Sequence, residues 1–267
     1  MENPQHRSDS HVPAVPAAAP EVLGSPSQPN DAGATNSVLL LRTVAQAAHR
    51  SASALSLEER IAVLSSCLRP WDRVTAATFY FGGTYDTRDG GTSIGTWSEF
   101  GELLVEWSGL VIPEKGSGPW FTPALSVNGR CRDEDIDCIS MLSFDCDGAG
   151  DWDVLRGLLD AAGAAFVLQR SSSHQPHQPK WHVHLPLATP WSGTKPQWRR
   201  IYRHAVGWFA GAAELVVDLD ADPLSYGFDV KTDRLGQPWY PAARRAPEAP
   251  VPETIVMERG ALELGLS

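Results

Sequence analysis

Apolar side chains are spaced in two different ways along the chain, and each spacing predicts a different kind of element. Short apolar runs bounded by polar residues and glycine have the pattern of buried strands, at residues 136–148, 164–173 and 181–188. Apolar residues repeated every three or four positions are typical of helices, at residues 95–109, 151–163 and 196–212. This order predicts an α+β fold, in which helices cover one face of a mixed sheet.

Composition divides the chain into four parts. Residues 1–36 are rich in Pro, Ala and Ser and poor in large apolar side chains, so we expect a disordered tail. Residues 37–74 have helical spacing, and Ser56 has a glutamate three positions later, as a capping box requires. We expect the main domain at residues 75–250 and a short C-terminal tail at residues 251–267.

The overall charge limits how the chain could bind nucleic acid. It holds 22 Lys and Arg residues against 32 Asp and Glu residues, a formal net charge of -10, so any such contact needs a local basic patch. The four cysteines show no CxxC spacing, and we expect reduced, buried thiols in a cytoplasmic protein. No apolar stretch approaches the roughly 18 to 20 residues that span a bilayer, so we expect no membrane partner.

The strand predicted at residues 136–148 ends in two aspartates. Side chains alternate along a strand, so Asp145 and Asp147 share one face, while Phe144 and Cys146 face the other way and suit a core. Two carboxylates this close repel each other, and a divalent cation such as Mg²⁺ or Mn²⁺ relieves the repulsion. A strand end that opens into a turn is the alternative, because Asp and Gly are common there.

Two histidines lie one residue apart in the strand predicted at residues 181–188. By the same alternation, His182 and His184 share a face. They could hold a metal ion together, one of them could contact a nucleotide phosphate, or both could line a solvated face. Asp147 and His182 are 35 positions apart, enough for a helix and a strand to bring the histidines alongside the aspartates.

Two further polar segments could contribute to the same site. The connector QRSSSHQPHQPK carries hydroxyls and cations suited to phosphate, among them Ser173, His174 and Lys180. Downstream, Asp229 in FDVKTDR precedes a lysine and Arg234 within a short turn. A carboxylate beside cations is, on its own, often only a local salt bridge.

In order and spacing, these segments resemble a known family. LSFDCDG, then SSSH and KWHVHLPL, then FDVKTDR and QPWYPA are similar to the three motifs of the archaeo-eukaryotic primase superfamily. The resemblance is strongest to the primase-polymerase domains of phage and plasmid replication proteins, and it runs from about Thr78 to Arg245. It implies an RRM-like antiparallel or mixed sheet core with flanking helices.

The resemblance also implies a role for each matching residue. Asp145 and Asp147 would be catalytic ligands for Mg²⁺ or Mn²⁺, and Asp229 would be the third carboxylate. His182, or His184 in its place, would contact the triphosphate of an incoming nucleotide. The connector and the turn would bind the nucleotide further, through Ser173, His174, Lys180 and Arg234.

The implied reaction is nucleotidyl transfer. It would synthesise or extend primers on single-stranded DNA from nucleoside triphosphates, with two divalent ions assisting. The chain has no GxxxxGK segment followed by Ser or Thr, so the domain would work alone or with a separate helicase. The helix predicted at residues 196–212 presents Arg199, Arg200 and Arg203, which could follow a template backbone or form a solvated face.

Two other functions fit parts of the pattern. The HVH sequence also resembles HUH-type rolling-circle replication endonucleases and relaxases, in which both histidines bind one metal and a tyrosine attacks DNA. Here His182 and His184 would be the pair, with Tyr202 or Tyr226 as the nucleophile, but the two aspartates would then have no role. The third alternative is a catalytically inactive, nucleic-acid-binding replication module.

Overall fold

The computed structural model describes residues 54–81, 90–114, 116–147, 152–175, 180–212 and 233–264. The described helices are α2 (Leu57–Ser66), α3 (Trp97–Ser108), the short 3-10 turn η2 (Asp133–Asp135), α4 (Trp152–Ala162) and α5 (Lys195–Ala212). The described strands are β1 (Leu68–Arg69), β2 (Val74–Tyr80), β3 (Gly91–Thr96), β4 (Trp120–Thr122), β5 (Ala124–Ser126), β6 (Ile136–Asp147), β7 (Phe166–Arg170), β8 (Lys180–Trp191), β9 (Thr254–Met257) and β10 (Ala261–Leu262). The α+β class predicted from the sequence is confirmed.

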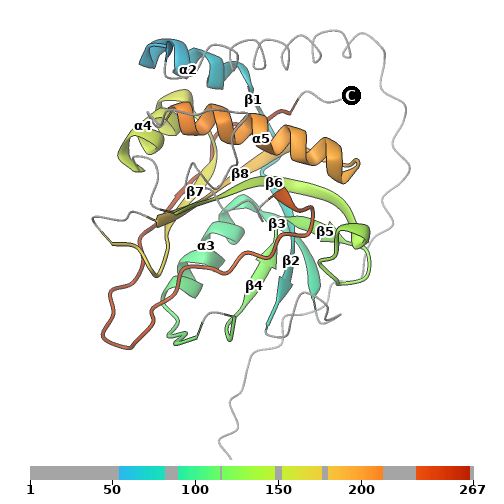
Figure 1. Cartoon of the computed structure of the whole chain (residues 1–267), viewed down its shortest axis with the longest axis vertical. Coiled ribbons are helices and arrows are strands. Elements are labelled where there is room, and N and C mark those ends of the chain that lie inside the picture. The colour runs from blue at the N-terminus through green and yellow to red at the C-terminus, as the bar shows by residue number, and fades with distance from the viewer. Residues whose placement is uncertain are drawn as a thin grey trace, which may run out of the picture.

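β8 is the central strand of the larger sheet, in which seven described strands take part (Figure 1). Along one edge β8 pairs antiparallel with β6, and along the other it pairs antiparallel with β7 and then in parallel with β10. β5 extends the sheet beyond β6, β9 extends it beyond β7, and β1 extends it beyond β10. The strand that carries both histidines is therefore hydrogen-bonded on both sides.

A smaller antiparallel sheet, in the order β3-β2-β4, lies against the larger one. The hydroxyl of Thr78 on β2 donates to the carbonyl of Ala124 over 2.9 Å and accepts from the N–H of Ser126 at 3.1 Å. The hydroxyl of Ser140 on β6 donates to the carbonyl of Ala76. Buried hydroxyls of β2 and β6 therefore join the two sheets.

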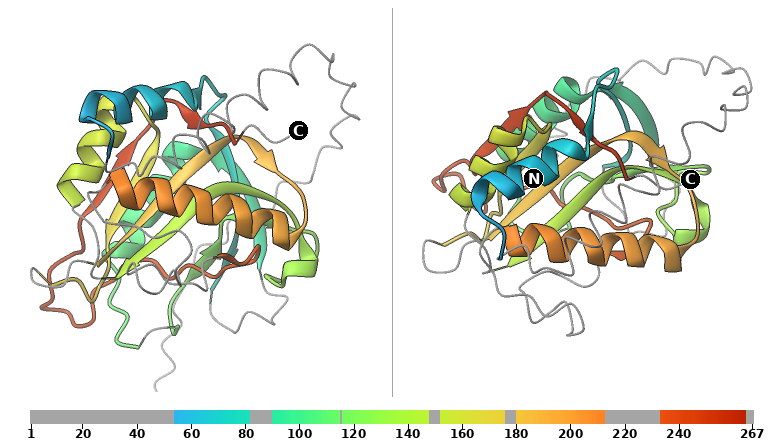
Figure 2. Two further views of the ribbon diagram at one scale, coloured as in Figure 1. Left: turned by 45° about the horizontal axis from the view of Figure 1, so that its top comes forward. Right: turned by 90° about the horizontal axis from the view of Figure 1, so that it is seen from above.

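Helices cover both faces of the larger sheet (Figures 1 and 2). Leu142 and Phe144 of β6 join the core that α2, α4 and α5 cover, whereas Met141 joins a second core beneath α3. We expected helices on one face only, and α3 is the exception. Its apolar side includes the buried Trp97 and Leu104, and it needs an apolar surface of its own, which the opposite face of the sheet supplies.

Side-chain caps fix where the first two described helices begin. The Ser56 hydroxyl accepts from the Glu59 N–H at 3.2 Å, and the Glu59 carboxylate accepts from the Ser56 N–H at 2.7 Å, which confirms the predicted capping box. Thr96 and Glu99 form the same box at the start of α3. Among the described helices, none is long and apolar enough to cross a membrane.

The first and last described segments of the chain pack against or pair with the elements of the central domain. α2, expected in a separate N-terminal segment, shares a core with α4 through Leu64. The stretch 251–267, expected to be a tail, contains β9 and β10, which pair with β7, β8 and β1. The alternating TIVM sequence of β9 suits the open edge of β7. The tail expected at residues 1–36 lies outside the described residues.

Candidate functional site

The pairing of β6 with β8 brings the acidic end of one strand beside the two histidines of the other. Asp145 lies opposite His182, and Ser143 lies opposite His184. Directly opposite residues of an antiparallel pair project from the same face, with Cβ atoms about 4.5 to 5.5 Å apart. The prediction that Asp145 shares one sheet face with both histidines is confirmed.

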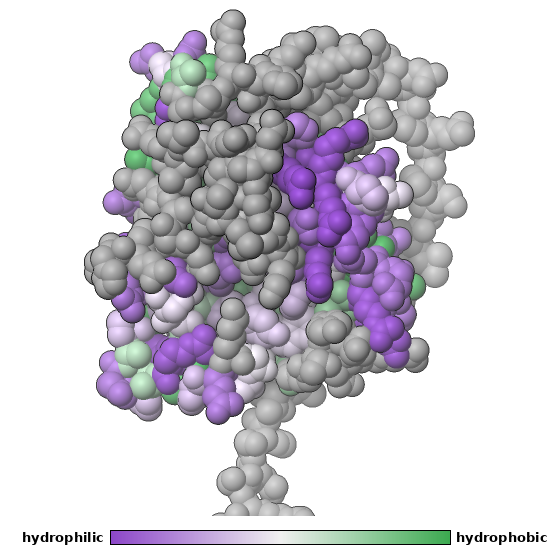
Figure 3. Space-filling model, viewed as in Figure 1, coloured by the Kyte–Doolittle hydropathy of each residue, from purple (hydrophilic) through white to green (hydrophobic). Residues whose placement is uncertain are grey.

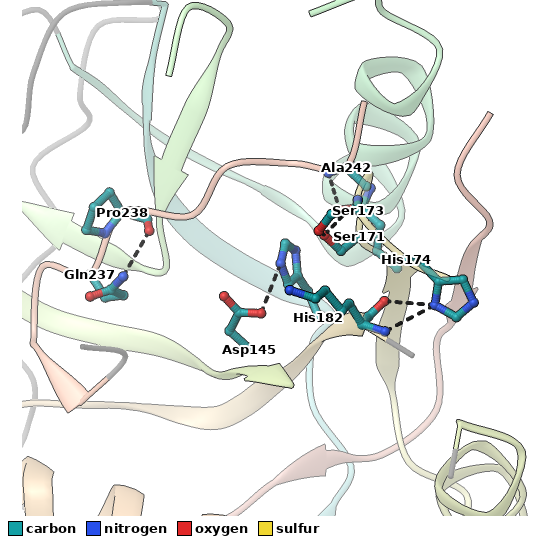
Figure 4. Close-up of polar contacts among 10 residues, drawn as sticks. Asp145, Ser171, Ser173, His174, His182, Gln237, Pro238 and Ala242 are labelled. Atoms are coloured by element: carbon teal, nitrogen blue, oxygen red, sulfur yellow. Dashed lines mark hydrogen bonds and ion pairs between the residues drawn. The ribbon is translucent and has the colours of Figure 1, made fainter. Parts of the chain in front are cut away.

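His182 makes a direct polar contact with Asp145. Its Nε2 lies 3.3 Å from Oδ1 of Asp145 (Figure 4). The side chains of His182 and Asp145 are 12% and 21% exposed, so the pair lies at the border of the core. The Asp145 side chain therefore keeps part of its surface in contact with solvent.

His184 has a different environment, although it shares the face. It is only 1% exposed, and its Nδ1 lies 2.8 Å from the Ser143 hydroxyl. Aromatic rings pack around it, those of Phe100, Phe121 and Trp239. Burial, and after it the nearby His182, lower the pKa of His184 well below 6.5, so the ring is neutral. Of the two histidines expected at the triphosphate, only His182 retains contact with solvent.

A segment at residues 233–245, called the strap below, crosses this face of the sheet. Its Trp239 exchanges two backbone hydrogen bonds with Phe121 on β4, of 2.7 and 3.0 Å. The indole centroid lies 5.6 Å from that of His182 and 5.2 Å from that of His184, and the ring is nearly perpendicular to both. Trp239 was not among the predicted site residues, although it belongs to the QPWYPA motif.

Gln169 holds the strap on the other side of His182. It lies opposite His182 on β7 and is 1% exposed. Its Oε1 accepts from the N–H of Ala242 at 3.0 Å, and its Nε2 donates to the carbonyl of Leu104 and to Oγ1 of Thr254. One amide thus joins β7, α3, β9 and the strap. In the sequence, the only indication of this role is that Gln169 is a polar residue at the end of an apolar run.

A carboxylate fixes the beginning of the strap. Asp133 accepts from the N–H groups of Leu235 and Gly236 at 3.0 and 3.4 Å, and Lys195 donates to its second oxygen. Burial opposes ionisation of Asp133, but Lys195 and the two N–H groups outweigh it, so the pKa of Asp133 is lowered. A Cβ at position 236 would lie 1.8 Å from the carbonyl oxygen of Cys131, so only glycine fits there.

The connector residues expected to bind phosphate form a turn before β8. Nδ1 of His174 accepts from the N–H of Lys180 at 3.1 Å, and the N–H of Ser171 donates to the Lys180 carbonyl at 3.0 Å. The hydroxyl of Ser173 is exposed and lies 3.2 Å from that of Ser171. His174 therefore uses one ring nitrogen to bind the backbone of Lys180 at the start of β8.

The two expected cations lie at different places. Lys180 begins β8 and is opposite Asp147 in the register, two positions from the contact between Asp145 and His182. Arg234 is exposed near the start of the strap. Lys180 is therefore next to the candidate site, whereas Arg234 is separated from it by the strap residues that lead to Trp239.

The described residues supply part of a metal site. The carboxylate of Asp145 is a hard oxygen ligand with partial exposure, which fits Mg²⁺ or Mn²⁺. Asp147 follows two positions later on the same strand, and its side chain, like the whole of Asp229, lies outside what the structure describes. No group of three His, Cys, Asp or Glu side chains that could hold a metal occurs in the described part.

The arrangement of the described residues does not suit the endonuclease alternative. Tyr202 is 3% exposed and packs on Phe144, on the face of the sheet that α2, α4 and α5 cover, away from the histidines. Tyr226 lies outside the described residues. His184 is enclosed and bonded to Ser143, so it is not placed to share an exposed metal ion with His182.

Comparisons with known proteins give one distant likeness. No protein-family model matches the chain, and no curated protein matches it. Among solved structures, it is similar to the AEP domain of the cyanophage S-2L primase-polymerase, with 15% identity and a TM-score of 0.37. That likeness covers 78% of this chain and 94% of the other. At this level it is a distant likeness between folds and says nothing of activity.

Proposed function

We propose that the protein is a nucleotidyltransferase of the primase-polymerase type, which synthesises or extends primers on single-stranded DNA in phage or plasmid replication. The observation that carries the proposal is the register of β6 and β8, which puts the partly exposed Asp145 beside His182. The order of the three motifs, which resembles that of the archaeo-eukaryotic primase superfamily, supports it.

In this proposal each residue near the β6 end has a distinct task. Asp145, Asp147 and Asp229 would hold the divalent cation, and Mg²⁺ or Mn²⁺, when bound, would supply positive charge that stabilises the leaving pyrophosphate. His182, oriented by Asp145, binds the phosphates of the incoming nucleoside triphosphate. The cation Lys180 and the polar groups of Ser173 and His174 bind it further.

In the proposal, His184 and Trp239 pack next to His182 and do not contact the nucleotide themselves. The neutral His184 ring, bonded to Ser143, and the indole of Trp239 close the floor of the site with aromatic surface. This floor keeps water from the inner side of His182 and limits its ring to one orientation. His184, expected as an alternative to His182 at the triphosphate, has this packing role in the proposal.

The test is primer synthesis by the full chain on a single-stranded DNA template with labelled nucleotides and Mn²⁺. The Asp145→Asn, Asp147→Asn double variant is expected to lose about 100-fold or more of the incorporation. Asp137→Asn, the same change at an exposed position of β6, is the matched control and is expected to leave incorporation unchanged. Incorporation by the double variant at the wild-type rate would overturn the proposal.

The non-catalytic alternative predicts a different combination of results. A nucleic-acid-binding module would bind the template but incorporate no nucleotide in either the wild type or the variants. Supplying ribonucleotides and deoxyribonucleotides in separate reactions, with and without an annealed primer, distinguishes synthesis from extension. The proposal includes a helicase partner. Adding a helicase is expected to change primer synthesis only when the template is double-stranded.

A further inference from the structure

α5 concentrates positive charge in an acidic protein. Its sequence, KPQWRRIYRHAVGWFAGA, contains Lys195, Arg199, Arg200 and Arg203 and no Asp or Glu. The whole chain has 32 acidic residues among 267, about one in eight, so a helix of 18 residues with the average composition would carry about two. The charge of α5 is therefore opposite to that of the chain as a whole.

The arginines lie on the outer side of α5. Trp198 and Ile201 are buried in the core against the larger sheet, whereas Arg199, Arg200 and Arg203 are exposed. Residues three and four positions apart are neighbours on a helix surface, and four positions correspond to a rise of about 6 Å. The three guanidinium groups therefore share one exposed stripe, called the arginine stripe below.

Two acidic side chains near the stripe neutralise only part of it. Asp233 pairs with Arg199 over 3.0 Å, and Asp133 pairs with Lys195. Arg200 and Arg203 have no acidic partner anywhere in the described part of the chain. Their charge is thus available to an external anion.

The strap connects the arginine stripe, on the face of the sheet that α5 covers, with the candidate site on the opposite face. Asp233, which contacts Arg199, is the first residue of the strap, and Trp239 of the strap lies against His182. The exposed Arg234 lies between them in sequence. Figure 3 shows a band of strongly hydrophilic side chains over the end of α5 at which the helix begins. A polar surface therefore leads from α5 toward the edge of the sheet where the strap starts.

We propose that the arginine stripe binds the phosphate backbone of single-stranded DNA and so marks where the template approaches the enzyme. The identification of the ligand as template rests on the proposed function. Guanidinium groups match phosphate oxygens in two-point hydrogen bonds and remain charged at every physiological pH. The apolar side of α5 is buried in the core, which leaves no apolar face for insertion into a lipid surface.

The test is binding of a fluorescent oligothymidylate to the full chain, without nucleotides and with EDTA, measured at several salt concentrations. The Arg200→Gln, Arg203→Gln double variant is compared with Arg73→Gln, Arg156→Gln, which removes the same charge from exposed positions elsewhere. Each phosphate contact on a single strand contributes about −0.7 to the slope of log K against log salt. The slope of the stripe variant is therefore expected to be less negative by about 1.4. At 100 mM salt that corresponds to binding weaker by about 10-fold to 30-fold.

Several outcomes would overturn the inference. A stripe variant with the wild-type slope shows that the arginines do not touch the strand, and an equal loss in the control pair shows an effect of overall charge. Binding to phosphatidylserine vesicles that depends on the stripe, without binding to the oligonucleotide, assigns the surface to lipid instead. The assay needs no catalysis, so failure of primer synthesis with an intact slope difference rejects the proposed reaction and retains the strand-binding surface.

Discussion

His182 on β8 lies directly opposite Asp145 on β6, with its Nε2 3.3 Å from Oδ1 of the carboxylate. The contact with Asp145 orients the imidazole together with two neighbours, since Trp239 packs on the ring and Gln169 lies opposite it on the next strand. The pair thus brings a carboxylate and an imidazole together at a partly exposed position.

Removing the imidazole of His182 is expected to weaken nucleotide binding more than turnover. A hydrogen bond to a charged phosphate contributes about 1.5 to 3 kcal/mol, so His182→Ala is expected to raise the KM for the nucleoside triphosphate by about 10-fold or more. Steady-state primer extension at several nucleotide concentrations measures it. An unchanged KM in a folded His182→Ala protein would remove His182 from the nucleotide site.

The buried His184 predicts that the protein loses stability in mild acid. Its pKa is lower in the folded protein than the usual 6.5, so the unfolded chain binds the extra proton first as the pH falls. The stability that depends on neutral His184 is present above about pH 6.5 and decreases below it, by at most about 1.4 kcal/mol per pH unit. Urea unfolding at pH 7.5 and 5.5 measures this.

His184→Phe is the variant that isolates this effect, since an apolar ring cannot take up a proton. We expect it to show a smaller decrease in the free energy of unfolding between the two pH values than the wild type. An equal decrease in both proteins would assign the acid sensitivity to other groups.

Gln169, which lies opposite His182, is expected to matter for stability because its amide joins four segments of the chain. Gln169→Met keeps the shape but leaves the N–H of Ala242 and the carbonyl of Leu104 without their buried partner, which is expected to cost about 2 to 4 kcal/mol. Gln237→Met is the matched control, because Gln237 bonds only its neighbour Pro238. Similar midpoints of chemical denaturation for the two variants would contradict a linking role for Gln169.

Two substitutions of Asp133, at the beginning of the strap, are expected to lower the free energy of unfolding by different amounts. Asp133→Asn keeps an oxygen for the N–H groups of Leu235 and Gly236 but loses the charge paired with Lys195, whereas Asp133→Ala loses both. We expect decreases in the free energy of unfolding of about 1 and about 2 kcal/mol, respectively. The lowered pKa of Asp133 means that its contribution is present above about pH 3.8 and disappears as the pH falls below that value. Equal losses in the two variants would show that the charge has no part.

Tyr202 distinguishes the polymerase from the endonuclease. Because Tyr202 is buried where α5 packs on Phe144, on the sheet face opposite the histidines, it cannot attack a DNA strand held at His182. We expect no covalent adduct between the protein and single-stranded DNA in denaturing gels, and an unchanged primer-extension rate in Tyr202→Phe. An adduct that disappears in Tyr202→Phe would support the endonuclease instead.

Alternation along single strands predicted much of the candidate site. It separated Asp145 from Phe144 and put His182 on the same face as His184, and the structure agrees. Alternation could not give the register between β6 and β8, because a shift by two residues preserves every face and yet removes Asp145 from His182. That relationship depends on packing across the whole sheet.

The difference between the two histidines could not be predicted from their own strand. They are equivalent by alternation, and only distant segments distinguish them, since Phe100, Phe121 and Trp239 come from α3, β4 and the strap. The same holds for α3, whose apolar side was evident in sequence while the face it covers was not. Local patterns indicate which residues are buried. Contacts between distant segments determine which surface each buried residue packs against.

The hydrogen bond from Gln169 to Thr254 joins residues 85 positions apart, and it affects when the site can form. A chain made from its N-terminus exposes β6, β7 and β8 well before β9. During that interval β7 has an open outer edge, a state prone to pairing with other chains. The candidate site therefore becomes complete only late in synthesis, and a messenger truncated before codon 254 would yield a protein with both aspartates and both histidines but without the strand that secures them.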